Sequence, residues 1–278
     1  MEPTFDVTQP LADPPSDFHT PTSPPATTTL APIWHTAVLV LVIAAVSVAG
    51  SMRAAQQQPM HNRYATYAAT GVMELLMLGW VAWGMRMRRI PLRTLFGDLS
   101  SRMRGILADF GVALLFWLVS LMVLGAVGAT WVSIQAWVTH GVVPWHATGA
   151  PLVPSHNPAE RAMLQVAPSN LQEAAAWALL CLLVGIVEES VFRGYFQGQF
   201  TAWARGNVFL GVFFSAVLFG AAHGYQGLRN MVLLVVFGAL FSLLMLYRRS
   251  LRPCIFAHSL HDLVAGLALG ILKVHHIL

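Results

Sequence analysis

Seven apolar segments constrain the fold of this chain more than any other feature of its sequence. They lie near residues 34–52, 65–85, 106–128, 172–198, 206–226, 229–247 and 254–273. A helix needs about 20 apolar residues to cross roughly 30 Å of hydrocarbon, so each segment has about the length of a membrane span. Only 10% of the residues are charged, whereas ordinary soluble domains have about 25%. The sequence therefore predicts an all-α, polytopic bundle of about seven transmembrane helices.

The pattern divides the chain into three regions. Residues 1–33 are rich in Pro and Thr and contain four acidic residues but no Lys or Arg, which predicts a disordered tail. The tail lacks the basic start of a secretory signal, so we expect the first apolar segment to be retained. Residues 34–170 then hold the first three spans and their loops. The third span continues to about residue 139. Residues 171–278 hold the last four spans.

The basic residues predict the orientation of the bundle. Six arginines lie between residues 86 and 104, after the second span. With the N-terminus in the cytoplasm, 11 of the 16 Lys and Arg residues fall on the cytoplasmic side. We therefore expect a multi-pass integral membrane protein with a cytoplasmic N-terminus, in the plasma (inner) membrane if the source is a prokaryote. The net charge of +4 gives no indication of a nucleic-acid partner.

An acidic pair, Glu188 and Glu189, follows the uncharged stretch from Ala174 to Val187. A charged side chain at the bilayer centre costs roughly 2.5–3.5 kcal/mol, and such residues usually face a functional site. Successive helical side chains are about 100° apart, so Glu189 and Arg193 share a face and can pair, while Glu188 points elsewhere. The competing interpretation is a cluster of charges at the membrane interface, where they are tolerated.

Two histidine motifs occur in later apolar segments. His223 lies near the end of the fifth segment, and His258 lies four residues before Asp262 in the last one. A carboxylate and two imidazoles that converge in an apolar site can activate water and stabilise an oxyanion. Each motif also has a structural interpretation, namely an interfacial histidine and a buried His–Asp pair. Glu74, in the second segment, could border the site, but an interhelical hydrogen bond is the favoured interpretation.

Taken together, these motifs resemble those of a known family. The patterns EExxxR at 188–193, FxxxH at 219–223 and HxxxD at 258–262 occur in this order on apolar helices. They are similar to the three motifs of the CPBP family, which includes the CAAX-type prenyl protease II and the bacterial bacteriocin-processing and self-immunity (Abi) proteins. The resemblance covers about residues 174–265.

The resemblance implies an intramembrane endopeptidase whose partners are membrane lipids and a protein or peptide substrate at the membrane. Glu188 would be the general base, and His223 would help it to hold the attacking water. His258 and Asp262 would polarise the scissile carbonyl and stabilise the oxyanion. The supporting residues would be Glu189 and Arg193. A proton or ion relay, or a non-catalytic immunity or scaffold protein, would use the same residues and remains the alternative.

Two questions stay open in the sequence. The third motif often ends in Asn in the prenyl proteases; Asp262 is therefore protonated, orients His258, or ligates a metal, because an ionised carboxylate cannot donate to an oxyanion. The family has been described both as metal-free glutamate peptidases and as metalloproteases. The expectation is therefore either no cofactor or one divalent metal such as zinc, held by Glu188, His223 and His258.

The depth of the motifs in the membrane also decides whether the site can form. At 1.5 Å per residue, straight vertical helices would leave the two histidines about 17 Å apart. They converge only if the fifth segment starts deeper, tilts strongly, or bends at Gly211 or Gly220. We expect a polar cavity that opens toward the cytoplasm, since water must reach the site.

Overall fold

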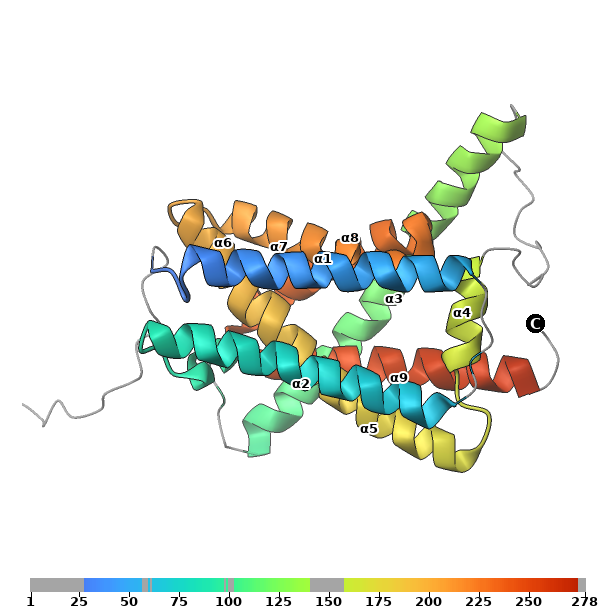
Figure 1. Ribbon diagram of the computed structural model, residues 1–278, viewed down its shortest axis with the longest axis horizontal. Helices are drawn as coiled ribbons and strands as arrows, with labels where there is room; N and C mark the ends of the chain where they lie inside the picture. Colours follow the sequence, from blue (N-terminus) through green and yellow to red (C-terminus); the bar gives the residue numbers. More distant parts are fainter. Residues whose placement is uncertain are drawn as a thin grey trace, which may run out of the picture.

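A computed structural model describes residues 28–56, 60, 62–97, 99, 103–140 and 158–274. Residues 1–27 of the predicted tail therefore lie outside the described residues. The described part is built from helices (Figure 1). The α-helices are α1 (Ile33–Ala55), α2 (Arg63–Met87), α3 (Met103–His140), α4 (Pro158–Val166), α5 (Leu171–Glu188), α6 (Gln197–Trp203), α7 (Val208–Ala222), α8 (Gly227–Arg248) and α9 (Arg252–Val274). Shorter turns of other helix types are η1 (Leu92–Phe96), η3 (Glu189–Phe196) and η4 (Gly224–Gln226).

Six helical segments of the described chain are long and apolar enough to cross a membrane. Among them, one continuous helical stretch runs from Leu171 to Trp203 and comprises α5, η3 and α6. The shorter α7 is apolar as well. The chain is thus a multi-pass membrane protein, and the predicted all-α bundle of about seven spans is confirmed. The third span is a single helix that reaches His140, close to the predicted residue 139.

The helices pack around α5 and its continuation η3. In Figure 1, α1 and α2 lie on the near face, while α3 crosses the bundle obliquely on the far side. The second half of α3 extends beyond the other helices, and only 11% of the apolar window of α3 is buried. Helix α5 packs against both α2 and α9, and α7 packs against α8. The buried apolar core contains side chains of α1, α2, η3, α7, α8 and α9.

Asparagine side chains begin three of these helices. Asn62, Asn170 and Asn207 are the N-caps of α2, α5 and α7, and each side chain accepts a hydrogen bond from a backbone N–H of the first turn. These bonds satisfy backbone donors that have no partner within the helix. Local sequence therefore fixes where each of these three helices starts.

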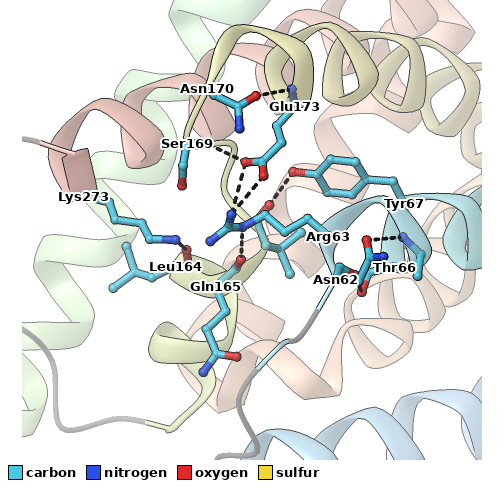
Figure 2. A network of polar contacts seen from close by, with 12 residues as sticks. Asn62, Arg63, Thr66, Tyr67, Leu164, Gln165, Ser169, Asn170, Glu173 and Lys273 are labelled. Carbon is cyan, nitrogen blue, oxygen red and sulfur yellow. Dashed lines mark hydrogen bonds and ion pairs between the residues drawn. The ribbon is translucent and has the colours of Figure 1, made fainter.

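The short helix α4 lies across one end of the bundle (Figure 1). Its last carbonyl groups have no partner within the helix. They accept hydrogen bonds from side chains of α2 and α9: Arg63 to Gln165, Tyr67 to Val166 and Lys273 to Leu164, at 2.8, 2.6 and 3.3 Å. The Arg63 guanidinium also donates to both oxygens of Glu173, at 3.1 Å each (Figure 2). These bonds join α4 to the ends of α2, α5 and α9.

The predicted tail is ordered at its last residues. Leu30 and Ala31 are buried, and their backbone N–H groups donate to the buried side chain of Gln199 at 2.7 and 3.2 Å. The side-chain amide of Gln199 donates back to the carbonyl of Ala31 at 2.8 Å. A buried glutamine on α6 thus supplies partners to the last residues before α1, and the tail composition does not reveal them.

Candidate active site

The acidic pair stands where the helix geometry changes. Glu188 is the last residue of α5, and the next eight residues, Glu189–Phe196, form the π-helical segment η3. All eight are buried. Wider π-helical turns are rare and frequently occur at functional sites. The change of geometry thus coincides with the residues that the sequence singled out.

Glu189 links two of the motifs. Its Oε1 lies 2.9 Å from Nη1 of Arg193, which is the ion pair predicted from their spacing. The same oxygen accepts a hydrogen bond from Nδ1 of His258 at 2.6 Å. The guanidinium of Arg193 is enclosed between the rings of Phe219 and Phe241, with centroids 4.1 and 5.1 Å away. Glu189 therefore both neutralises Arg193 and orients His258, and only the first role could be predicted from the sequence.

Both imidazoles present the same nitrogen to Glu188. Nδ1 of His223 bonds the carbonyl of Phe219 at 2.8 Å, while Nδ1 of His258 bonds Glu189. The Nδ1–H is the donor in both bonds, because a carbonyl or carboxylate oxygen can only accept. Nε2 of His223 then lies 3.9 Å from Oε1 of Glu188, and Nε2 of His258 lies 3.6 Å from Oε2. Both distances exceed a direct hydrogen bond, so a water molecule or a substrate oxygen can be shared between these groups.

His223 reaches this depth because α7 is short. The fifth span was expected near 206–226, but the helix ends at Ala222 and a 3-10 turn follows. Ser47 of α1 holds this turn: its Oγ donates to the carbonyl of Ala221 at 2.6 Å and accepts from the N–H of Gly224 at 3.0 Å. Ser47 lies eight residues before the end of α1, or about 12 Å along the helix. The expected separation of about 17 Å between the histidines is thereby removed.

Asp262 lies at the margin of the cluster. Its Oδ2 is 3.6 Å from Nε2 of His258, one helical turn away on α9. The Asp262 side chain is 31% exposed, whereas that of His258 is 4% exposed. Nε1 of Trp177 on α5 donates to the backbone carbonyl of Asp262 at 3.1 Å, which fixes α9 against α5 at this level. Exposure within the site therefore rises along α9, in the direction of α4.

The metal ligands expected from the sequence were Glu188, His223 and His258. Within the ranges that the structure describes, no three His, Cys, Asp or Glu side chains are arranged to hold an ion. Nδ1 of each imidazole is hydrogen-bonded, so Nε2 is the free nitrogen in both rings, and it lies 3.6–3.9 Å from an oxygen of Glu188. These side chains carry the reaction proposed below.

The match to known families covers this part of the molecule. Residues 170–264 match the family model described as type II CAAX prenyl endopeptidase Rce1-like. This match, over about a third of the chain, supports a place in the CPBP/CAAX intramembrane protease family. The matched region includes all three motifs and the helices that carry them, so the resemblance read from the motifs is confirmed. Neither the curated proteins nor the solved structures include a significant match to the chain.

Two features of the site were missed in the sequence. The bond from Glu189 to His258 joins residues that are 69 positions apart, and Ser47 acts on a turn more than 170 positions away. A serine in an apolar span and the second acid of a pair carry no local signal of these contacts. The spacing of Phe219 and His223 did carry a local signal, because the bond from Nδ1 of His223 to the carbonyl of Phe219 spans one helical turn.

Proposed function

We propose that this protein is an intramembrane endopeptidase that hydrolyses a peptide bond of a membrane-associated protein or peptide, with Glu188 as the general base. The observation that carries the proposal is the position of Glu188 between two fixed imidazoles, each of which directs Nε2 at one of its oxygens. General bases work where they are positioned within reach of water and substrate by groups of fixed orientation. The match to the CAAX endopeptidase model supports the reaction class.

The reaction follows from the roles of these groups. Glu188 accepts a proton from a water molecule that it shares with Nε2 of His223, and the water oxygen forms a bond to the scissile carbonyl carbon. His258, as imidazolium, donates from Nε2 to the resulting oxyanion, because Nδ1 stays bonded to Glu189. The carboxylate of Glu189, bonded to Nδ1 of His258, stabilises that positive charge. Glu188 then delivers its proton to the amide nitrogen as the C–N bond breaks.

Asp262 has a role that depends on its proton. A protonated carboxyl donates to the oxyanion alongside His258, as the asparagine of the prenyl proteases would. Its distance of 3.6 Å from His258 leaves both groups free to contact one substrate oxygen. This is the role that we propose for it.

The test uses purified protein in lipid nanodiscs and a farnesylated peptide that ends in a CAAX motif. Glu188→Gln and His223→Ala should each lower kcat by at least 10²- to 10⁴-fold, the usual contribution of general acid–base catalysis. Unfolding temperature and gel-filtration profile should stay close to those of the parent. Cleavage by either variant at the parental rate would refute the assignment. Proton flux into liposomes that requires Glu188, without cleavage of any peptide, would favour the relay function instead.

The orientation in the membrane decides which substrates reach the site. We propose a cytoplasmic N-terminus from the distribution of arginines. In that orientation α4 lies on the outer side, and the exposed margin of the site at Asp262 faces away from the cytoplasm. The arginine count and the expected opening toward the cytoplasm therefore conflict.

A labelling experiment resolves this conflict. Arg93→Cys and Gln172→Cys place single exposed thiols at opposite ends of the bundle, while the native Cys181 and Cys254 are buried. With the proposed orientation, an impermeant maleimide added to intact cells should label position 172 and not position 93. The reverse labelling would refute the arginine-based orientation and open the site to the cytoplasm, where CAAX proteins are found.

A further inference from the structure

Helices α2 and α5 keep one register along their contact. Three pairs are separated by nearly the same number of residues along the chain: Arg63 with Glu173 by an ion pair, Tyr67 with Trp177 by ring contact at 5.5 Å, and Gly71 with Leu180 and Leu183 across a close approach. The first of these pairs appears in Figure 2. The helices therefore run in the same direction, and each turn of α2 lies level with the corresponding turn of α5.

This register places Glu74 beside the site. Glu74 follows Gly71 by three residues and shares its helical face, so it lies about one turn further along α5, toward Glu188. The carboxyl group interacts electrostatically with Glu188, His258 and Asp262. Figure 1 shows the same arrangement, with α2 running along α5. An acid on the second span thus lies beside the cluster of Glu188, His223, His258 and Asp262.

The Glu74 side chain has no partner for one of its oxygens. The residue is 8% exposed, and its Oε2 is buried without a hydrogen bond. No described residue forms the interhelical hydrogen bond that the sequence suggested, so that expectation was wrong. Oε2 of Glu188 is likewise buried and without a hydrogen bond. An unpaired buried oxygen destabilises a fold, and acids within membrane spans usually face a functional cavity.

We propose that Glu74 is a further residue of this site, which positions the substrate by accepting a hydrogen bond from a backbone N–H of the peptide close to the scissile bond. This inference rests on the proposed peptidase function. The occupant follows from the chemistry: the carboxyl group offers an acceptor oxygen whether or not it is ionised, and an extended peptide presents main-chain N–H groups whatever its side chains. Glu74 takes no part in the proton transfers, which Glu188 performs.

The experiment compares Glu74→Leu with Glu74→Gln in nanodiscs, with the farnesylated CAAX peptide as probe. Leucine removes the acceptor, and KM should rise by about tenfold or more, because a buried N–H of the peptide is left without a partner. Glutamine keeps an acceptor oxygen and should restore KM toward the parental value. In Glu74→Leu kcat should fall much less than KM rises, and in Glu74→Gln kcat should stay close to the parental value. Thr70→Leu, at an exposed position of the same helix, is the control for added apolar surface.

Stability separates positioning from a structural role. Because Oε2 has no partner in the fold, Glu74→Leu should leave the unfolding temperature unchanged or raise it. A lowered unfolding temperature, an unchanged KM in Glu74→Leu, or a loss of kcat in Glu74→Gln as large as in Glu188→Gln would each overturn the inference. If the parent cleaves and Glu188→Gln does not, an unchanged Glu74→Leu refutes this role alone. If Glu188→Gln cleaves as well as the parent, the proposed function itself fails.

Discussion

Ser47 gives the most specific test of how the fold positions His223. This serine lies on α1, outside the region matched by the family model, and touches neither Glu188 nor His258 by any hydrogen bond described. Its Oγ bonds the carbonyl of Ala221 and the N–H of Gly224, at 2.6 and 3.0 Å, on either side of His223. Ser47→Ala removes both bonds and leaves the turn free to shift.

The magnitude follows from these two bonds. A hydrogen bond of this kind contributes about 0.5–1.5 kcal/mol net, so the pair stabilises the turn by roughly 1–3 kcal/mol. If this energy holds His223 in its active position, its loss appears in kcat as about a 5- to 150-fold decrease, since 1.4 kcal/mol corresponds to tenfold. The KM should change little, because Ser47 makes no contact with the groups that bind the peptide.

The assay is cleavage of the farnesylated CAAX peptide in nanodiscs, with the unfolding temperature measured in parallel. Ser51→Ala is the matched control, because the Oγ of Ser51 donates only to the carbonyl of Ser47 within α1, at 2.8 Å. We expect this control to keep the parental kcat. A kcat for Ser47→Ala within twofold of the parent, or an equal loss in Ser51→Ala, would refute the reasoning.

Two further predictions concern packing and the oxyanion. Gly84→Ala on α2 should lower the free energy of unfolding by about 1–3 kcal/mol, since a Cβ there would overlap the ring of His35. The control is Gly79→Ala, where a Cβ would meet no atom within 4 Å, and it should be neutral or stabilising by up to about 1 kcal/mol. Equal effects of the two substitutions in thermal unfolding would contradict this prediction. Asp262→Asn should keep kcat within about tenfold of the parent, because the amide also donates to an oxyanion, whereas Asp262→Leu should lose about 10²-fold or more. Loss of activity in Asp262→Asn would show that Asp262 acts through its charge.

The local sequence predicted the membrane architecture well because its determinants are local. Span length depends on about 20 consecutive apolar residues, and helix starts depend on a cap within the next turn. The Glu189–Arg193 pair is separated by a single helical turn, so its formation also followed from spacing. In each case the interacting groups lie within a few residues of one another.

How closely the three motifs approach one another was harder to predict from the sequence. Treating the spans as straight and full-length placed His223 too far from His258, because nothing local indicates that α7 stops at Ala222 and turns inside the bundle. The stop is supported by Ser47 of another helix. Glu74 was misjudged for the same reason, since only the register between α2 and α5 reveals what its side chain faces.

The sequence by itself determined that this chain crosses a membrane and which residues form the candidate site, because charge and imidazole groups are costly within apolar helices and are therefore conspicuous. The tertiary structure decided how these groups face one another. Glu189 orients His258, the end of α7 brings His223 to Glu188, and α2 adds a buried carboxyl to the cluster. These relations depend on helix ends and on packing between distant segments, and no spacing along the chain encodes them directly.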